Sequence, residues 1–116
     1  MSNIDTVQAG FKEIADRGMG AMLDMPHTDD FAVHVPTLAI DAQGEDEVRT
    51  KFIDLVEQVH MRSELIDALA EGPFVTCTLR VESDLRPEPT TAVQVIRFDE
   101  EGRAAELWAI SPPLPA

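Results

Sequence analysis

The stretch Ala92–Pro113, AVQVIRFDEEGRAAELWAISPP, predicts a β-hairpin. Its first arm, Val93–Phe98, is rich in the β-branched and aromatic residues that favour strands. Asp99–Gly102 then supplies the acidic residues and the glycine of a tight reversal. Arg103–Ser111 returns as a second strand, and the two prolines that follow stop it because proline has no amide donor for a sheet. Such a hairpin needs a cover, which we expect from the N-terminal half of the chain.

The N-terminal half predicts two long amphipathic helices. Apolar residues recur at spacings of three and four from Ile4 to Met25, which indicates one helix that ends at Pro26. A polar turn is expected at 27–30, and a short edge strand at Leu38–Ile40. A second helix is expected over 45–59, where three acidic residues occupy the positive end of the helix dipole.

The remaining segments predict antiparallel strands at 61–70 and 74–83. In the second of these, apolar residues at 75, 77, 79 and 81 alternate with polar residues. Because successive side chains of a strand point to opposite faces, Arg80 and Glu82 are expected to point outward, into solvent or a dimer interface. Cys77 belongs to the apolar face and is interpreted as a small buried hydrophobic residue.

Composition narrows the function. The 116 residues form one domain, 1–116, whose formal net charge of −13 argues against binding nucleic acid or anionic membranes. The single cysteine excludes an internal disulfide and a cysteine metal cluster. No signal peptide, lipidation motif or long apolar run is found, which predicts a cytoplasmic protein without a membrane partner. We expect no metal and no cofactor.

The hairpin motif RFDEEGR followed by ELWAISPP resembles the last hairpin of the SnoaL-like, polyketide cyclase-like branch of the NTF2-like superfamily. Phe31, His34 and Pro36 also fit a Phe-x-x-His-x-Pro segment of that family. The resemblance implies an α+β fold, a cone-shaped roll in which N-terminal helices pack inside a curved antiparallel sheet around a pocket. It also implies a homodimer formed through the outer sheet face.

The same resemblance implies where the functional residues lie. His34 is the candidate catalytic base, and the expected pocket-lining residues are Phe11, Met22, Phe52, Gln94, Trp108 and Ala109. Cyclases of this branch carry an aspartate after the tryptophan, whereas this chain has Ala109, which cannot transfer a proton. The chain also has no tyrosine, the hydrogen-bond donor used by ketosteroid isomerases. The isomerase, cyclase and epoxide hydrolase mechanisms therefore each lack an essential group.

Several interpretations stay open. His34 is either a pocket base or a structural histidine satisfied by hydrogen bonds, and the second is favoured. Arg80 and Glu82 resemble the Arg-x-acid pair of the epoxide hydrolases, but strand parity favours a surface position. His27, Asp29 and His60 have the spacing of a non-haem iron site, although a polar turn is the simpler explanation of His27 and Asp29.

The leading hypothesis is a protein that binds a small apolar molecule, with isomerase- or cyclase-like catalysis only if His34 replaces the usual aspartate. The alternative is a non-enzymatic homodimerising accessory or scaffold module with a filled interior.

Overall fold

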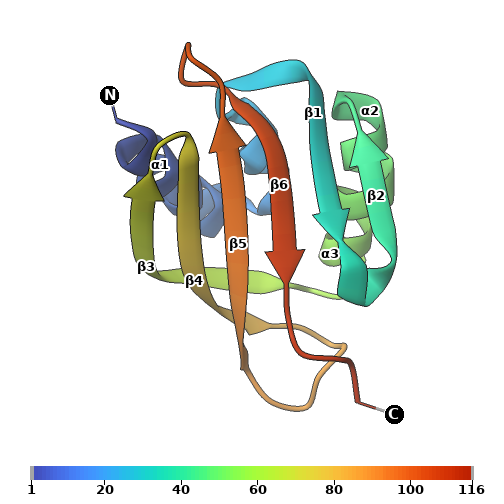
Figure 1. Ribbon diagram of the computed structural model, residues 1–116. Helices are drawn as coiled ribbons and strands as arrows, with labels where there is room; N and C mark the ends of the chain where they lie inside the picture. The colour runs from blue at the N-terminus through green and yellow to red at the C-terminus, as the bar shows by residue number, and fades with distance from the viewer. Residues whose placement is uncertain (1, 116) are drawn as a thin grey trace.

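A computed structural model describes residues 2–115, which form a six-stranded sheet with helices packed on one face (Figure 1). The strand order is β2-β1-β6-β5-β4-β3, so the last strand in sequence lies near the centre of the sheet. The strands span β1 His27–Val35, β2 Ile40–Gln43, β3 Arg62–Glu71, β4 Phe74–Glu82, β5 Thr90–Phe98 and β6 Ala104–Ile110. This arrangement confirms the α+β roll expected from the sequence. No helix in the described part is long and apolar enough to cross a membrane.

The hairpin that predicted the fold is present as β5 and β6, which pair antiparallel from Val93 with Ile110 to Phe98 with Ala104. Asp99 organises the turn between them. One of its carboxylate oxygens accepts hydrogen bonds from the backbone N–H groups of Glu101 and Arg103, both at 2.9 Å. The strand β6 also pairs with β1, and this one pair is parallel, so the sheet is mixed rather than purely antiparallel.

The first predicted helix is shorter than its apolar stripe. The helix α1, Asn3–Arg17, begins with a capping box between Ser2 and Asp5 and ends at Gly18, whose φ of +94° is unfavourable for residues with a side chain. A 3₁₀-helix, Met19–Asp24, carries the rest of the stripe. The apolar spacing continues through both elements because the 3₁₀ segment also buries one side.

The second predicted helix is present over the expected range, as α2 Glu45–Val48, a π-helical turn Arg49–Ile53 and α3 Asp54–Gln58. The segment 27–30, expected to be a polar turn, is instead the start of β1. The expected edge strand at Leu38–Ile40 begins two residues later, because Pro36–Leu38 forms a 3₁₀ turn and Ala39 has a positive φ of 54°.

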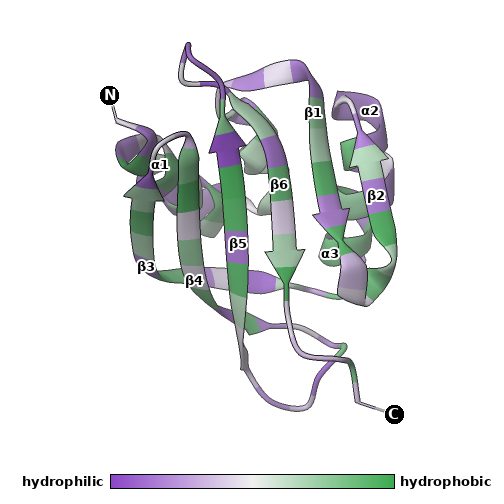
Figure 2. Cartoon of the chain, viewed as in Figure 1, coloured by the Kyte–Doolittle hydropathy of each residue, from purple (hydrophilic) through white to green (hydrophobic). Residues whose placement is uncertain are grey.

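Strand parity divides the sheet into an apolar inner face and a mixed outer face. The inner-face side chains of β1, β4 and β6 include Val33, Val75 and Leu107, each no more than 2% exposed, and they pack against helix residues such as Val56. The apolar character of the central strands is visible in Figure 2 beside the polar loops. The helices therefore cover the inner face, and the outer face has no cover within the described chain.

Replacing a core isoleucine should cost far more stability than replacing an exposed one. Ile53 is 1% exposed, and Ile53→Ala should lower the free energy of unfolding by about 2–5 kcal/mol, because the lost contacts leave a cavity. Ile66 is 56% exposed, and Ile66→Ala should change it by no more than about 0.5 kcal/mol. Urea unfolding of both variants measures the difference, and equal losses would contradict this core assignment.

Candidate functional site

Two small cavities lie between the helices and the inner face of the sheet. The larger has a volume of about 70 Å³ and the smaller about 30 Å³. They share wall residues Met19, Phe52, Ser63 and Gln94, so we treat them as two compartments of one interior cavity. Both are well below the roughly 300 Å³ at the lower end of usual small-molecule sites. The interior is therefore largely filled by side chains.

Polar side chains are few in this interior cavity, and Gln94 is the most central. It lies on β5 in an inner-face row with Ala68, Cys77 and Ala109, which are its successive neighbours across β3, β4 and β6. The Gln94 amide and the Ser63 hydroxyl form no hydrogen bond with another described side chain. Neither is a fully buried polar atom without a partner. Both groups can therefore bond to a molecule in the cavity.

The wall of the interior cavity carries no group suited to proton transfer at neutral pH. Among residues 2–115, its lining includes no histidine, carboxylate, lysine, tyrosine or cysteine. Ala109, the residue where the resemblance leads us to expect an aspartate, occupies the wall beside Gln94. Cys77 is fully buried next to Gln94, and burial raises the pKa of its thiol to about 11, so it stays protonated and unreactive.

The cavity is closed at one end by two segments without regular structure. The loop after β4 and the segment 111–115 after β6 lie together beyond the end of the sheet (Figure 1). The Arg86 guanidinium of this loop donates hydrogen bonds to the carbonyl oxygens of Pro112 and Pro113. Thr37 Oγ1 donates to the Ser111 carbonyl at 3.1 Å, and Leu114 forms part of the cavity wall. Few hydrogen bonds therefore hold this closure.

His34 and Trp108, expected to line the pocket, lie on the outer face of the sheet. On β1, His34 stands between Val33 and Val35, which are 0% and 5% exposed and point inward. Because neighbouring side chains of a strand alternate, His34 must point outward. Its ring stacks on Trp108 with a centroid separation of 5.9 Å. Neither residue lines the interior cavity.

His34 is the centre of a charged network that crosses four strands. Its Nδ1 lies 2.7 Å from Asp41 on β2, and its Nε2 lies 2.7 Å from Glu106 on β6. Glu106 also accepts a hydrogen bond from Arg97 on β5 at 3.3 Å. Carboxylates only accept hydrogen bonds, so both ring nitrogens must donate, which requires the doubly protonated imidazolium. The hydrogen bond to Asp41, and secondarily that to Glu106, raises the pKa of His34.

The other expected pocket residues come together around one space. Phe11, Met22, Phe52, Gln94 and Ala109 all line the interior cavity, which they enter from α1, the 3₁₀-helix, the π-helical turn and the inner face of the sheet. Methionine side chains are flexible, and several surround this space, so the wall can change shape. Sequence reasoning missed Arg86, because its loop is rich in proline and matches no motif.

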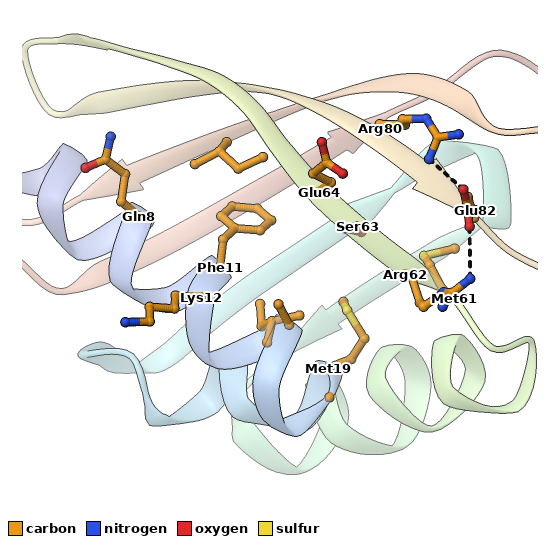
Figure 3. A pocket seen from close by; sticks show the side chains of 14 residues that line it. Gln8, Phe11, Lys12, Met19, Met61, Arg62, Ser63, Glu64, Arg80 and Glu82 are labelled. Carbon is orange, nitrogen blue, oxygen red and sulfur yellow. Dashed lines mark hydrogen bonds and ion pairs between the residues drawn. The ribbon is translucent and has the colours of Figure 1, made fainter.

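Arg80 and Glu82 line an open groove of about 690 Å³ between α1 and β3, which borders the interior cavity through the shared wall residues Phe11, Ile14, Met19 and Ser63. Figure 3 shows Phe11 and Gln8 reaching toward β3, with Arg80, Glu82 and Arg62 joined by ion pairs at one end. The Arg80 side chain is 49% exposed and the Glu82 side chain 35% exposed. These exposures agree with the surface position expected from strand parity.

The histidines of the proposed iron spacing belong to separate sites. His27 Nδ1 lies 2.8 Å from the Met25 carbonyl, and its Nε2 lies 3.6 Å from Glu45. His60 follows α3 and bonds to Asp84 at 2.6 Å. Within residues 2–115, no group of three histidine, cysteine, aspartate or glutamate side chains is arranged so that it could hold a metal ion.

Known proteins resemble this chain in structure rather than in sequence. No family model and no curated protein matches the sequence. An NTF2-like protein of unknown function from Burkholderia pseudomallei superimposes with a TM-score of 0.80 and 25% identity, over 97% of this chain and 92% of the other. A SnoaL-like protein of unknown function from Burkholderia thailandensis gives a TM-score of 0.76 and 15% identity, over 95% and 94% of the two chains.

A candidate polyketide cyclase from Sinorhizobium meliloti gives a TM-score of 0.77 and 15% identity, over 94% of this chain and 99% of the other. The chain therefore has the NTF2-like fold, and its structural neighbours include SnoaL-like proteins, as its last hairpin indicates.

The His34 network should make stability depend on pH. A group whose pKa is raised by folding stabilises the folded state below its unfolded pKa of about 6.5, and this stabilisation is lost as the pH rises through the folded pKa. The difference in unfolding free energy between the wild type and His34→Gln should therefore be largest near pH 6 and shrink toward pH 9. Urea unfolding at several pH values measures it.

An NMR titration of the His34 ring provides the control. Asp41→Asn should lower the His34 pKa, whereas Asp46→Asn, which removes a carboxylate from α2, should leave it unchanged. A His34 pKa that is insensitive to Asp41→Asn would contradict the network.

Proposed function

We propose that this protein binds a small, mainly apolar molecule in its interior cavity without transforming it. The observation that carries the proposal is the wall of that cavity. It combines adaptable methionines with polar groups that bond to no other described side chain, among them those of Gln94 and Ser63, and has no group for proton transfer. A wall of this kind can position a ligand through one or two hydrogen bonds but offers no acid or base for isomerisation, cyclisation or hydrolysis.

The small volume of the interior cavity sets a condition on this function. A space of about 70 Å³ admits only a few non-hydrogen atoms, so a larger ligand must displace part of the wall. The methionines and the segment after β6 are the parts of that wall held by the weakest constraints. The same small volume favours the second candidate function, an accessory module that uses the fold only as a scaffold.

Ligand-induced stabilisation distinguishes the two functions. Straight-chain alcohols and ketones of four to ten carbons provide suitable neutral probes, and a probe at 100 times its Kd should stabilise the folded state by about 2.7 kcal/mol. Ala109→Phe should abolish the effect because the larger side chain occupies the cavity. Gln94→Leu should weaken binding of these hydrogen-bonding probes. Thermal unfolding measures all three proteins.

An exposed alanine serves as the matched control for the blocking variant. Ala9→Phe on α1 adds the same ring at an exposed position, and it should leave the probe response intact. If no probe stabilises the wild type, the binding function fails and the scaffold function is favoured.

We also propose that the protein is a homodimer through the outer sheet face. Support comes from a cross-strand row of outer-face residues that runs across the whole sheet, formed by Leu69, Thr76, Val95, Trp108, His34 and Asp41. Leu69 is 67% exposed, and the central members of the row are apolar. The end of the row on β1 and β2 carries the charges of His34 and Asp41, which have opposite signs and which two copies related by a two-fold axis can match.

A single charge at the centre of that row should separate the copies. Val95→Glu should convert the dimer to a monomer, because burying an unpaired carboxylate in an interface is strongly unfavourable. Gln8→Glu adds the same charge on α1, at an exposed position, and should leave the dimer intact. Analytical ultracentrifugation measures the mass. A monomeric wild type, or a Val95→Glu dimer, would contradict this interface.

A further inference from the structure

Arg86 differs from the other arginines of this acidic chain. Every other arginine in the part of the chain that the structure describes lies within 4.0 Å of at least one carboxylate. Among residues 2–115, Arg86 has no carboxylate at that distance, and it donates instead to two main-chain carbonyls, those of Pro112 and Pro113. The sequence contains 22 acidic residues and only 9 lysines and arginines, so an arginine without a carboxylate partner is unexpected.

The position of Arg86 gives this exception a functional meaning. It is the one charged side chain among the described residues that line the interior cavity. The rest of that wall is apolar apart from neutral hydroxyl and amide groups. A molecule that fills the cavity with an apolar body can therefore place one negative group beside the guanidinium.

We propose that the ligand of the interior cavity is an apolar monocarboxylate whose carboxylate pairs with Arg86. This inference rests on the proposed binding function and names the chemical class of its ligand. A carboxylate matches the planar fork of a guanidinium with two parallel hydrogen bonds. The carbonyls of Pro112 and Pro113 carry no charge, so a carboxylate is the stronger partner for the same N–H groups.

The exchange of partners at Arg86 also accounts for how the ligand gains space. When the carboxylate of the ligand binds the Arg86 guanidinium, the segment 111–115 loses both of its hydrogen bonds to Arg86. It keeps the hydrogen bonds between Ser111 and Thr37. Leu114 is then free to leave the cavity wall, and the volume it occupied becomes available to the apolar body of the ligand. Binding of the charge therefore favours opening of the cavity, beyond the displacement of the wall that any larger ligand requires.

Because the protein is strongly acidic, tighter binding of a carboxylate than of the matching alcohol would have to come from one local site. A chain with a formal charge of −13 repels carboxylates over most of its surface, so general electrostatic attraction cannot produce tighter binding of an acid than of the matching alcohol. A preference for the acid would therefore report a local cationic partner.

Octanoate and octan-1-ol form a matched pair of probes for calorimetric titration. The wild type should bind octanoate about tenfold or more tightly than octan-1-ol, as expected for a charge-assisted hydrogen bond. Arg86→Gln should remove this preference while leaving octan-1-ol binding within about twofold. Arg86→Lys should retain part of the preference because it keeps the charge but not the fork. Arg103→Gln, which removes an exposed arginine from the β5–β6 turn, should behave as the wild type.

A second measurement does not depend on any Arg86 variant folding. The NMR signals of the Leu114 methyl groups, which belong to a residue already 36% exposed, should shift more with octanoate than with octan-1-ol, because only the carboxylate releases the segment from Arg86. Equal affinities for the two probes in the wild type, or an acid preference that survives in Arg86→Gln, would overturn the ligand class while leaving cavity binding intact. Binding of neither probe would overturn both this inference and the proposed binding function.

Discussion

The two-sided pairing of β6 is the constraint on which the rest of this structure depends. β6 is held by β5 in an antiparallel register and by β1 in a parallel one, so its orientation about its own axis is fixed from both sides. Leu107 therefore points toward the helices and Trp108 away from them. A shift of one residue would exchange the two faces and expose the core side chains, which makes any other register costly.

This constraint separates the chemistry of the molecule into two compartments. The outer face holds the ionic groups nearest the centre of the sheet, with His34 between Asp41 and Glu106. The inner face holds neutral side chains, and its most central polar group is the Gln94 amide. A titrating imidazole on one face cannot reach a molecule on the other, because the sheet backbone lies between them. His34, the candidate base of the resemblance, therefore lies on the outer surface, away from the interior cavity.

The sequence predicted most of the architecture because its signals were local. The β5–β6 hairpin carries strand-forming arms and an Asp-to-Gly turn, and the second helix has a regular apolar stripe. The C-terminal end of α1 is harder to predict, because the apolar residues continue at helical spacing past Gly18. Only the backbone conformation of Gly18 shows that the helix ends there. The start of β1 at His27 depends on pairing with β6, a contact between distant segments that no local pattern records.

Part of the cavity wall could be predicted, for a related reason. Phe11 and Phe52 belong to apolar helical stripes and Gln94 follows from the resemblance, and all three line the interior cavity. His34 and Trp108 were assigned to the pocket by resemblance alone, although the alternation of Val33 and Val35 around His34 already indicates the outer face. Arg86 could not have been found in this way, because its significance depends on the absence of a nearby carboxylate, which is a property of the folded chain.

The size of the interior cavity follows from the parts of the wall that can move. The sheet is held by continuous hydrogen-bond ladders, and the helices are held against it by close packing. Neither can move to enlarge the interior cavity without loss of core contacts. The loop around Arg86 and the segment after β6 form no ladder and meet through a few side-chain hydrogen bonds. Local opening free energies are lowest in regions of this kind. The volume of the closed cavity therefore reflects the position of one short segment, and the interior can accept a larger molecule while the rest of the fold stays unchanged.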